Sequence, residues 1–366
     1  MAYTTIDKSD DYFNILLWTG NGASPRALSG LGFNPDWIWT KARNSGSVNH
    51  AVWDIVRGGN IVLNPDENYP DNNGAAIADH GVISSFTSPT NDGFTVADGS
   101  SAPYPRLTVN DASIFGGAAG NYVGWCWKAG GTASSNTNGT ITSNVSANTT
   151  SGFSIVSYTG NGSNGASFGH GLGVKPKIVL IKNRTTAKNW VYWQDTTNNG
   201  TSDVRLCLNL TNANFNNFHV TFGTSTITLG DTDDAWNKSG DNLIAYCFAE
   251  KQGYSKFGSY TGNGSTDGTF VYTGFKPAFV MLKSSSSGSV GWITHDNKRI
   301  GFNPNNYYVE PNNSNAESAD TDKILLLSNG FKLTSTSATW NASGGSYIYM
   351  AFAEEPLVGD NPATAR

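Results

Sequence analysis

A five-residue motif occurs three times in this chain. It reads Trp-Thr-Gly-Asn-Gly at residues 18–22 and Tyr-Thr-Gly-Asn-Gly at residues 158–162 and 260–264. In each copy a proline follows 13 or 14 residues after the last glycine, and a lysine follows six residues after that proline. The proline–lysine pairs are Pro35 and Lys41, Pro176 and Lys182, and Pro277 and Lys283. Because both spacings recur in all three places, the sequence predicts a tandem triplication.

Each copy has the composition of a strand, a tight turn and a second strand. Gly-Asn-Gly can adopt positive φ values, which permits a sharp reversal of the chain. Proline is tolerated at the start of the next strand, because its missing N–H is not needed in the ladder there. The strands that follow Pro176 and Pro277 are continuous apolar runs, at residues 178–181 and 278–282. Such runs are typical of strands that are covered on both faces.

The composition favours an all-β fold. Only 14% of residues are charged, whereas the chain has 42 Gly, 11 Trp, 15 Tyr and 18 Phe. No window places apolar residues at the helical spacing over three turns. Six or more short strand-like runs fall in the third repeat, which predicts a sandwich of two antiparallel sheets. We therefore expect three tandem, related antiparallel β-sandwiches of jelly-roll or lectin-like type.

The repeats also set the expected domain boundaries. The first sandwich, with a polar N-terminal arm, should span residues 1–131, the second residues 153–252, and the third, with a short polar tail, residues 253–366. The stretch at 132–152 is dominated by Ser, Thr, Asn and Gly and is by composition a linker. Its β-branched residues at 140–146 leave open the alternative that it pairs as an edge strand.

Charge and cysteine usage exclude several classes of protein. The net charge is −5 and Lys and Arg are not clustered, which argues against nucleic-acid binding. No apolar run approaches the roughly 20 residues of a membrane span, and the first residues do not resemble a signal peptide. Three cysteines cannot form a disulfide framework. Cys126 and Cys247 occupy equivalent positions, where the third repeat has Ala351, so we interpret them as small buried residues.

Several segments resemble a repeated β-domain found in virion proteins of tailed bacteriophages, which are often of the tail-fibre type and of poorly defined role. These segments are residues 157–162, 169–173, 275–280 and 347–354, together with 12–13 and 125–131 in the first repeat. The resemblance covers nearly the whole chain. It implies a virion protein that is assembled in the host cytoplasm, and it supplies no catalytic residues.

The resemblance implies a non-enzymatic structural protein, exposed on the particle as a tail fibre or receptor-binding component for host attachment. A long fibre would normally add a coiled-coil or β-helical shaft, which this sequence lacks, so capsid decoration or a tail-adaptor role stays open. A carbohydrate-binding module or glycan hydrolase is a further alternative. Expected partners are other virion proteins, a host surface glycan and copies of the chain itself. The sparse charge and many aromatics predict apolar surface that a homotrimer would bury.

The residues do not form a recognisable catalytic pattern. Glu250 and Glu354 recur between repeats, but the first repeat has Ala129 there, so no carboxylate pair is repeated. The five histidines never fall at metal-ligand spacing. His50 and Asp54 could belong to a triad, but no nucleophile elbow accompanies them. We therefore predict that the chain is not an enzyme.

Two sets of residues are candidates for ligand contacts. The residues near predicted loops that could stack on a sugar ring or lie at a subunit contact are Trp190, Trp193, Trp236 and Trp292. The acidic run that could bind Ca²⁺ comprises Asp231, Asp233 and Asp234. Clustered carboxylates suit this hard cation, although short acidic loops also occur simply facing solvent. No other cofactor is expected.

Overall fold

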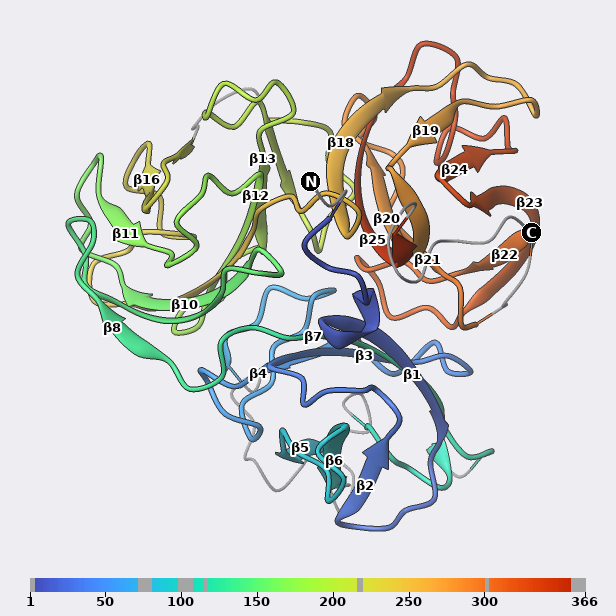
Figure 1. The fold of residues 1–366 in the computed structure, drawn as a ribbon, viewed down its shortest axis with the longest axis horizontal. Coiled ribbons are helices and arrows are strands. Elements are labelled where there is room, and N and C mark those ends of the chain that lie inside the picture. Colours follow the sequence, from blue (N-terminus) through green and yellow to red (C-terminus); the bar gives the residue numbers. More distant parts are fainter. Residues whose placement is uncertain are drawn as a thin grey trace.

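The computed structural model describes residues 4–71, 81–97, 108–114, 117–215, 220–299 and 303–356. Within these ranges the regular elements are β-strands and one short 3-10 turn, η1 (Ser9–Asp11). The strands form six sheets, in which neighbouring strands run antiparallel. The predicted all-β class with antiparallel pairing is therefore confirmed (Figure 1).

Three large sheets share one strand order, and each belongs to one of three units. In unit 1 (residues 13–127) the order is β1 (Phe13–Thr19), β7 (Asn121–Trp127), β3 (Trp37–Ala42) and β4 (Ala51–Asp54). In unit 2 (residues 134–248) it is β10 (Phe153–Thr159), β17 (Asn242–Phe248), β12 (Ile178–Asn183) and β13 (Val191–Gln194). In unit 3 (residues 255–356) it is β18 (Ser255–Thr261), β25 (Ser346–Pro356), β20 (Phe275–Ser284) and β21 (Ile293–Asp296).

Each unit also contains a smaller sheet. The smaller sheets are β2 (Arg26–Ser29), β6 (Gly93–Ala97) and β5 (Val82–Ser85) in unit 1; β11 (Ser167–Gly169), β16 (Thr226–Leu229) and β15 (Val220–Phe222) in unit 2; and β19 (Phe270–Tyr272), β24 (Gly330–Leu333), β23 (Ser318–Leu327) and β22 (Asn305–Tyr308) in unit 3. A separate apolar cluster joins the two sheets of each unit. In unit 1, for example, Leu28 and Phe94 of the smaller sheet share a cluster with Trp53 of the large sheet.

Residues 132–152, for which a linker and an edge strand were both open, belong to the sheet of unit 2. They contain β8 (Ser134–Asn136) and β9 (Ser143–Asn148). Strand β9 pairs with β10 from Phe153 to Tyr158, and β8 pairs with β9. At the opposite edge, β14 (Val204–Cys207) pairs with β13. The large sheet of unit 2 therefore has seven strands.

The pairing registers align the three units residue by residue. Trp37, Ile178 and Phe279 lie at one equivalent position of their sheets. Each pairs with an aromatic residue of one neighbouring strand and with the last residue of the other: Trp37 with Trp127 and Asp54, Ile178 with Phe248 and Gln194, and Phe279 with Phe352 and Asp296. Two residues earlier lie the three prolines of the sequence motif, and four residues later its three lysines. The regular spacing in the sequence therefore corresponds to one strand that is repeated in three sheets.

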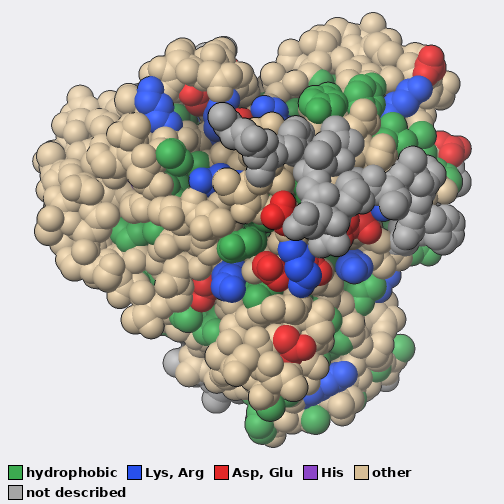
Figure 2. All heavy atoms as spheres, viewed as in Figure 1, with side chains coloured by type: hydrophobic (Ala, Val, Ile, Leu, Met, Phe, Trp, Pro, Cys, Tyr) green, Lys and Arg blue, Asp and Glu red, His purple; other side chains and the backbone are tan. Residues whose placement is uncertain are grey.

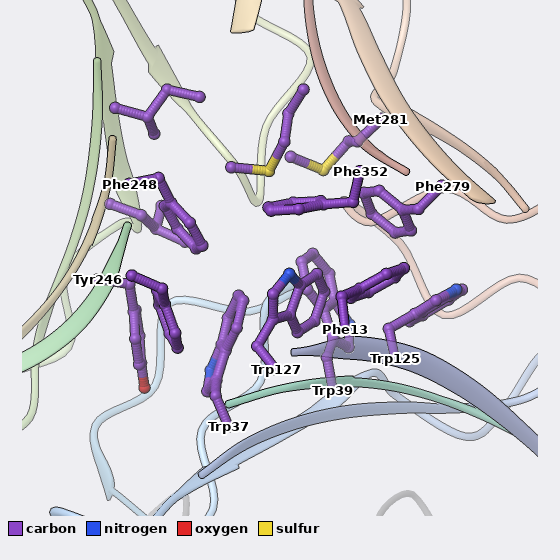
Figure 3. Packing of buried hydrophobic residues seen from close by; sticks show 14 of the residues in the cluster. Phe13, Trp37, Trp39, Trp125, Trp127, Tyr246, Phe248, Phe279, Met281 and Phe352 are labelled. Carbon is purple, nitrogen blue, oxygen red and sulfur yellow. The ribbon is translucent and has the colours of Figure 1, made fainter. Parts of the chain in front are cut away.

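The three large sheets turn their second faces toward one another around a central cluster (Figures 1 and 3). This central cluster includes Phe13, Trp37, Trp127, Phe153, Tyr246, Phe248, Phe279, Met281 and Phe352. Ring centroids of Trp37 and Tyr246 lie 4.8 Å apart across units 1 and 2, and those of Phe13 and Phe279 lie 5.7 Å apart across units 1 and 3. The apolar strands are thus covered on both faces, as predicted, and the second cover is the other two units.

The centre of this cluster is almost fully packed. It leaves an apolar void of about 10 Å³. The three equivalent residues Trp37, Ile178 and Phe279 all line this void, so it lies where the three units meet. A void of this size without polar groups in its wall has nothing to hold a water molecule.

Truncating Phe279 should therefore destabilise the whole chain. Its side chain is only 1% exposed and its ring contacts Phe13, Trp125, Trp127 and Phe352. We expect Phe279→Ala to lower the free energy of unfolding by about 3–5 kcal/mol, because it opens a cavity among packed rings. Chemical denaturation measures this, with Tyr69→Ala, an exposed aromatic, as the matched control. A loss below about 1 kcal/mol for Phe279→Ala would contradict the packing described.

Candidate functional site

The four tryptophans predicted as ligand contacts are all buried. Trp190, Trp193, Trp236 and Trp292 are at most 1% exposed. Trp193 and Trp236 pack edge to face inside unit 2, with ring centroids 5.0 Å apart. The indole N–H of Trp190 donates to the carbonyl of Asn64 in unit 1 at 2.7 Å, and that of Trp292 donates to Cys207 in unit 2 at 2.9 Å. The structure therefore corrects this expectation: the rings fill cores and junctions within one chain and are not accessible to a glycan.

His50 occupies the position in unit 1 that Trp190 and Trp292 occupy in the other units. Its Nδ1 accepts the indole N–H of Trp39 at 2.9 Å, so Nε2 carries the ring proton and donates to the carbonyl of Glu310 in unit 3 at 3.1 Å. Burial lowers the pKa of His50 well below its usual value. Each unit thus sends one ring N–H to a backbone carbonyl of the preceding unit, which closes a ring of three junctions.

A second set of side chains links the units through the last residue of β4, β13 and β21. These residues are Asp54, Gln194 and Asp296. Asp54 accepts a hydrogen bond from the hydroxyl of Tyr246 in unit 2 at 2.7 Å, and Asp296 accepts one from the indole of Trp125 in unit 1 at 3.0 Å. Gln194 donates to the carbonyl of Gly258 in unit 3 at 3.2 Å. Each unit contacts the next through the same position.

An ionic network stabilises the junction between units 1 and 2. The Arg57 guanidinium donates to Asp54 at 2.5 Å, and both side chains are fully buried. Arg57 also lies 3.6 Å from Asp71, and Asp71 forms an ion pair with Arg184 of unit 2 at 2.8 Å. Burial acts to lower the pKa of Arg57, but Asp54, Tyr246 and Asp71 together outweigh it and raise the pKa. The two acids therefore compensate the buried positive charge.

The junction between units 3 and 1 repeats this network. Arg299 donates to Asp296 at 2.6 Å, and Glu317 lies 3.3 Å from Arg299 and 2.9 Å from Arg43 of unit 1. The junction between units 2 and 3 instead has Gln194, described above, and a backbone bond of 2.8 Å from Asn214 N–H to Ser285. Two junctions are therefore ionic, and the third is held by neutral groups at the equivalent positions.

The three lysines of the sequence motif are buried in equivalent turns. The ammonium groups of Lys41, Lys182 and Lys283 each donate to two backbone carbonyls of the turn after the strand. The acceptors are Ala42 and Ser45, Asn183 and Lys188, and Ser284 and Ser287. Burial lowers the pKa of Lys41 and Lys283 to about 8 and that of Lys182 to about 7. Since their protons point at carbonyls, these lysines close turns.

One buried acid takes part in none of these contacts. Asp66 lies in a unit 1 loop, and its carboxylate oxygens have no hydrogen-bond partner within the described residues. Burial raises the pKa of Asp66 to about 8, so the carboxyl is mostly protonated at neutral pH. Glu67 and Lys41 are the charged groups that act on it.

The remaining acidic and histidine candidates have structural contacts. The Asp231 carboxylate accepts a hydrogen bond from the N–H of Asp233, and the Asp233 carboxylate accepts one from the N–H of Ala235. Asp234 forms an ion pair with Lys188 at 3.2 Å. Over the described ranges, no three His, Cys, Asp or Glu side chains are grouped to hold a metal ion. The calcium site remains a prediction.

Glu250 and Glu354 pair with Lys256 and Lys276, at 3.3 and 2.6 Å. His170 is buried, with Nε2 at 3.2 Å from the carbonyl of Gly223. His80 and His219 lie outside the described residues.

The surface carries an open pocket of about 290 Å³ in unit 2. Three lysines line it, Lys175, Lys177 and Lys251, beside Asp195 and Glu250. The ammonium of Lys177 donates to the carbonyl of Asp195 at 3.2 Å. The wall of the pocket therefore carries charges of both signs.

A pair of exposed aromatic rings lies on β19. Phe270 is 44% and Tyr272 is 55% exposed, whereas Val271 between them faces the core of unit 3. Apolar side chains gather over this part of unit 3 in Figure 2. The register places Ala27 and Ser29 of unit 1 at the equivalent positions, and Ser167 and Gly169 of unit 2. Sequence reasoning missed this pair, although a comparison of the three repeats shows large rings where two copies have small residues.

The buried ion pair at the first junction should be costly to break from one side. We expect Arg57→Ala to lower the free energy of unfolding by about 3–5 kcal/mol, because Asp54 would remain buried without its counter-charge. Lys256→Ala is the control, since its ion pair with Glu250 is partly exposed and should contribute at most about 1 kcal/mol. Equal effects of the two changes in chemical denaturation would contradict the network described.

Comparisons with known proteins add a family but no activity. No curated protein matches the chain, and no solved structure matches it. No helix in the described part is long and apolar enough to cross a membrane. One family model matches residues 8–356, a range that includes all three units. The chain belongs to the family described as Domain of unknown function (DUF7483).

Proposed function

We propose that this chain is a non-enzymatic structural protein of a tailed-bacteriophage virion, exposed on the particle and acting by binding. The virion assignment is supported by the sequence resemblance of its repeats. The observation that carries the non-enzymatic part is that most of the buried ionisable groups make structural contacts, with Asp66 as the exception. Asp54, Asp296 and their arginines hold the unit junctions, and the motif lysines close turns. A general acid or base must instead be free to reach a substrate.

We further infer that the three units are copies of one β-sandwich domain of jelly-roll or lectin-like type. Their common strand order and register support this inference. The large sheets meet at the central cluster, so the smaller sheets and their loops face outward in three directions (Figure 1). Such an arrangement suits a rigid body that binds other virion proteins or a host receptor through its outer surfaces, as a tail fibre component does.

A second role, as a capsid decoration or tail-adaptor protein, is favoured by the closed ring of units. The central aromatic cluster is buried within one chain, and the association of copies of the chain as a homotrimer stays a prediction. A single copy therefore has no central aromatic surface left to cover, and it could dock alone on a particle. In this role the outer surfaces would bind other virion proteins, and attachment to a host glycan would not be required.

Analysis of purified particles tests the virion assignment. For a phage that encodes this chain, we expect mass spectrometry to find the protein in gradient-purified particles at a fixed ratio to the major capsid protein. Antibody labelling of intact particles should then place it on the tail or on the head, which separates the two roles. If the protein stays in the soluble fraction of the lysate and is absent from particles, the virion assignment is wrong.

A further inference from the structure

The smaller sheets of the three units end in the same edge strand. This edge strand is β2 in unit 1, β11 in unit 2 and β19 in unit 3. Thr269 and Thr273 flank β19 and bond inward: the carbonyl of Thr269 accepts the N–H of Leu333, and the N–H of Thr273 donates to the carbonyl of Asn329, both at 3.0 Å. Because inward and outward residues alternate in an antiparallel ladder, the backbone groups of Phe270 and Tyr272 point away from the sheet. An exposed edge of this kind can pair with another strand, and proteins normally protect it.

Unit 2 covers its edge with a segment of its own chain. The N–H of Ile141 donates to the carbonyl of Ser167 at 2.8 Å, and the N–H of Ser167 donates to the hydroxyl of Thr140 at 2.9 Å. The hydroxyl of Ser143 donates to the carbonyl of Gly169 at 2.9 Å. Ser167 and Gly169 are the counterparts of Phe270 and Tyr272, so residues 140–143 bond to both outward backbone groups of Ser167 and to the outward carbonyl of Gly169.

Unit 1 protects its edge in another way. Pro25 precedes β2 and the charged Arg26 begins it. The Arg26 guanidinium donates to the carbonyl of Thr19 at 2.6 Å and to the side chain of Asn110 at 2.8 Å, so the arginine is held at the edge. Proline and charge are both common means of blocking an edge strand. The outward side chains that follow, Ala27 and Ser29, are small.

Unit 3 has neither protection. In the part of the chain that the structure describes, no residue bonds to the outward backbone groups of Phe270 or Tyr272. Strand β19 contains no proline and no charged residue. The side chains that face solvent are instead two large rings. The Phe270 ring extends over Gly330, since a Cβ added to this glycine would lie 3.2 Å from Cε2 of Phe270. The two other copies of this edge show that the fold does not need these rings.

We propose that the edge of β19 binds an extended segment of a partner protein, which adds a strand to the smaller sheet of unit 3. The partner segment would resemble residues 139–143, which seal the equivalent edge in unit 2: extended, uncharged and rich in Thr, Ser and β-branched residues. Backbone hydrogen bonds to Phe270 and Tyr272 provide the pairing, and the two rings provide apolar contact. The proposal deepens the binding role but does not depend on the virion assignment, so the two can fail separately.

The chain's own covering segment provides a probe. A capped synthetic peptide with the sequence of residues 137–145 is added to the full-length protein at roughly millimolar concentration, and amide hydrogen exchange is followed by mass spectrometry. We expect exchange over residues 269–273 to slow at least tenfold, with no change over 27–29 or 167–169. A control peptide of the same length with proline at alternate positions lacks the N–H groups that pair, so it should have no effect. Unchanged exchange over 269–273 at saturating peptide would overturn the proposal.

Two substitutions at one residue separate backbone pairing from ring contact. Tyr272→Ala removes the ring and keeps the outward N–H, whereas Tyr272→Pro removes both and leaves the inward bonds of Thr269 and Thr273 in place. We expect Tyr272→Ala to weaken peptide binding about fivefold and Tyr272→Pro to abolish it. Both variants should keep the parent thermal unfolding midpoint, since β19 is an edge strand.

The same two variants also test whether the site binds a ligand of another class. If the two variants bind the peptide equally, the outward N–H plays no part and strand addition is wrong. If a soluble bacterial polysaccharide, and not the peptide, binds in a way that Tyr272→Ala abolishes, the rings are a glycan platform and the proposal also fails. Tyr69→Ala, at an exposed aromatic outside β19, should change neither measurement.

Discussion

The burial of three sheet faces against one another is the constraint on which the rest of this structure depends. Each large sheet has an apolar second face, and a single unit in water would leave that face exposed. Side chains of this size contribute about 1.5–3 kcal/mol each when they leave water, so the central cluster is a dominant stabilising term. It also explains why β3, β12 and β20 are buried at every residue, the lysines near their ends included.

The junction chemistry follows from this central cluster. The three units meet head to tail around an axis. Such a ring closes only when the contact surface of each unit fits the complementary surface of the next unit. The ring N–H of His50, Trp190 or Trp292 makes one contact of each junction. Buried ion pairs add little net stability compared with apolar packing, but an unpaired partner is costly. Two junctions are ionic and one is neutral, so the junctions differ in chemistry. This difference favours one arrangement of the three units around the ring.

Much of the fold could be predicted from the sequence, because the repeat spacing is a local property. The six-residue step from proline to lysine locates one equivalent strand in each unit, and the lack of helical periodicity indicates the all-β class. The neighbours of Trp190 and Trp292 could not be predicted. Spacing places these residues near loops, but only the arrangement of units shows that the loops face another unit. A comparison of the repeats does offer one signal: Trp190 and Trp292 align with His50, and a polar ring at all three positions indicates a shared hydrogen-bonding role.

The exposed pair on β19 was missed for the opposite reason. Phe270 and Tyr272 look like core residues in a sequence rich in aromatics, and alternation alone does not tell which face of a strand is inside. Only the position of Val271 in the core of unit 3 shows that its neighbours point outward. Ala27 and Ser29, and Ser167 and Gly169, then show that the site is a feature of one unit. The family match supplies no function for it.

Differential scanning calorimetry of the full chain tests the central claim most directly. If the three units share one central cluster, they should unfold together, and the van't Hoff enthalpy should equal the calorimetric enthalpy within error. Phe279→Ala, although it changes only unit 3, should then shift the whole transition to lower temperature. Independent units would instead give a van't Hoff enthalpy of about one third of the calorimetric value, or separate transitions of which only one responds to Phe279→Ala. That result would contradict the account.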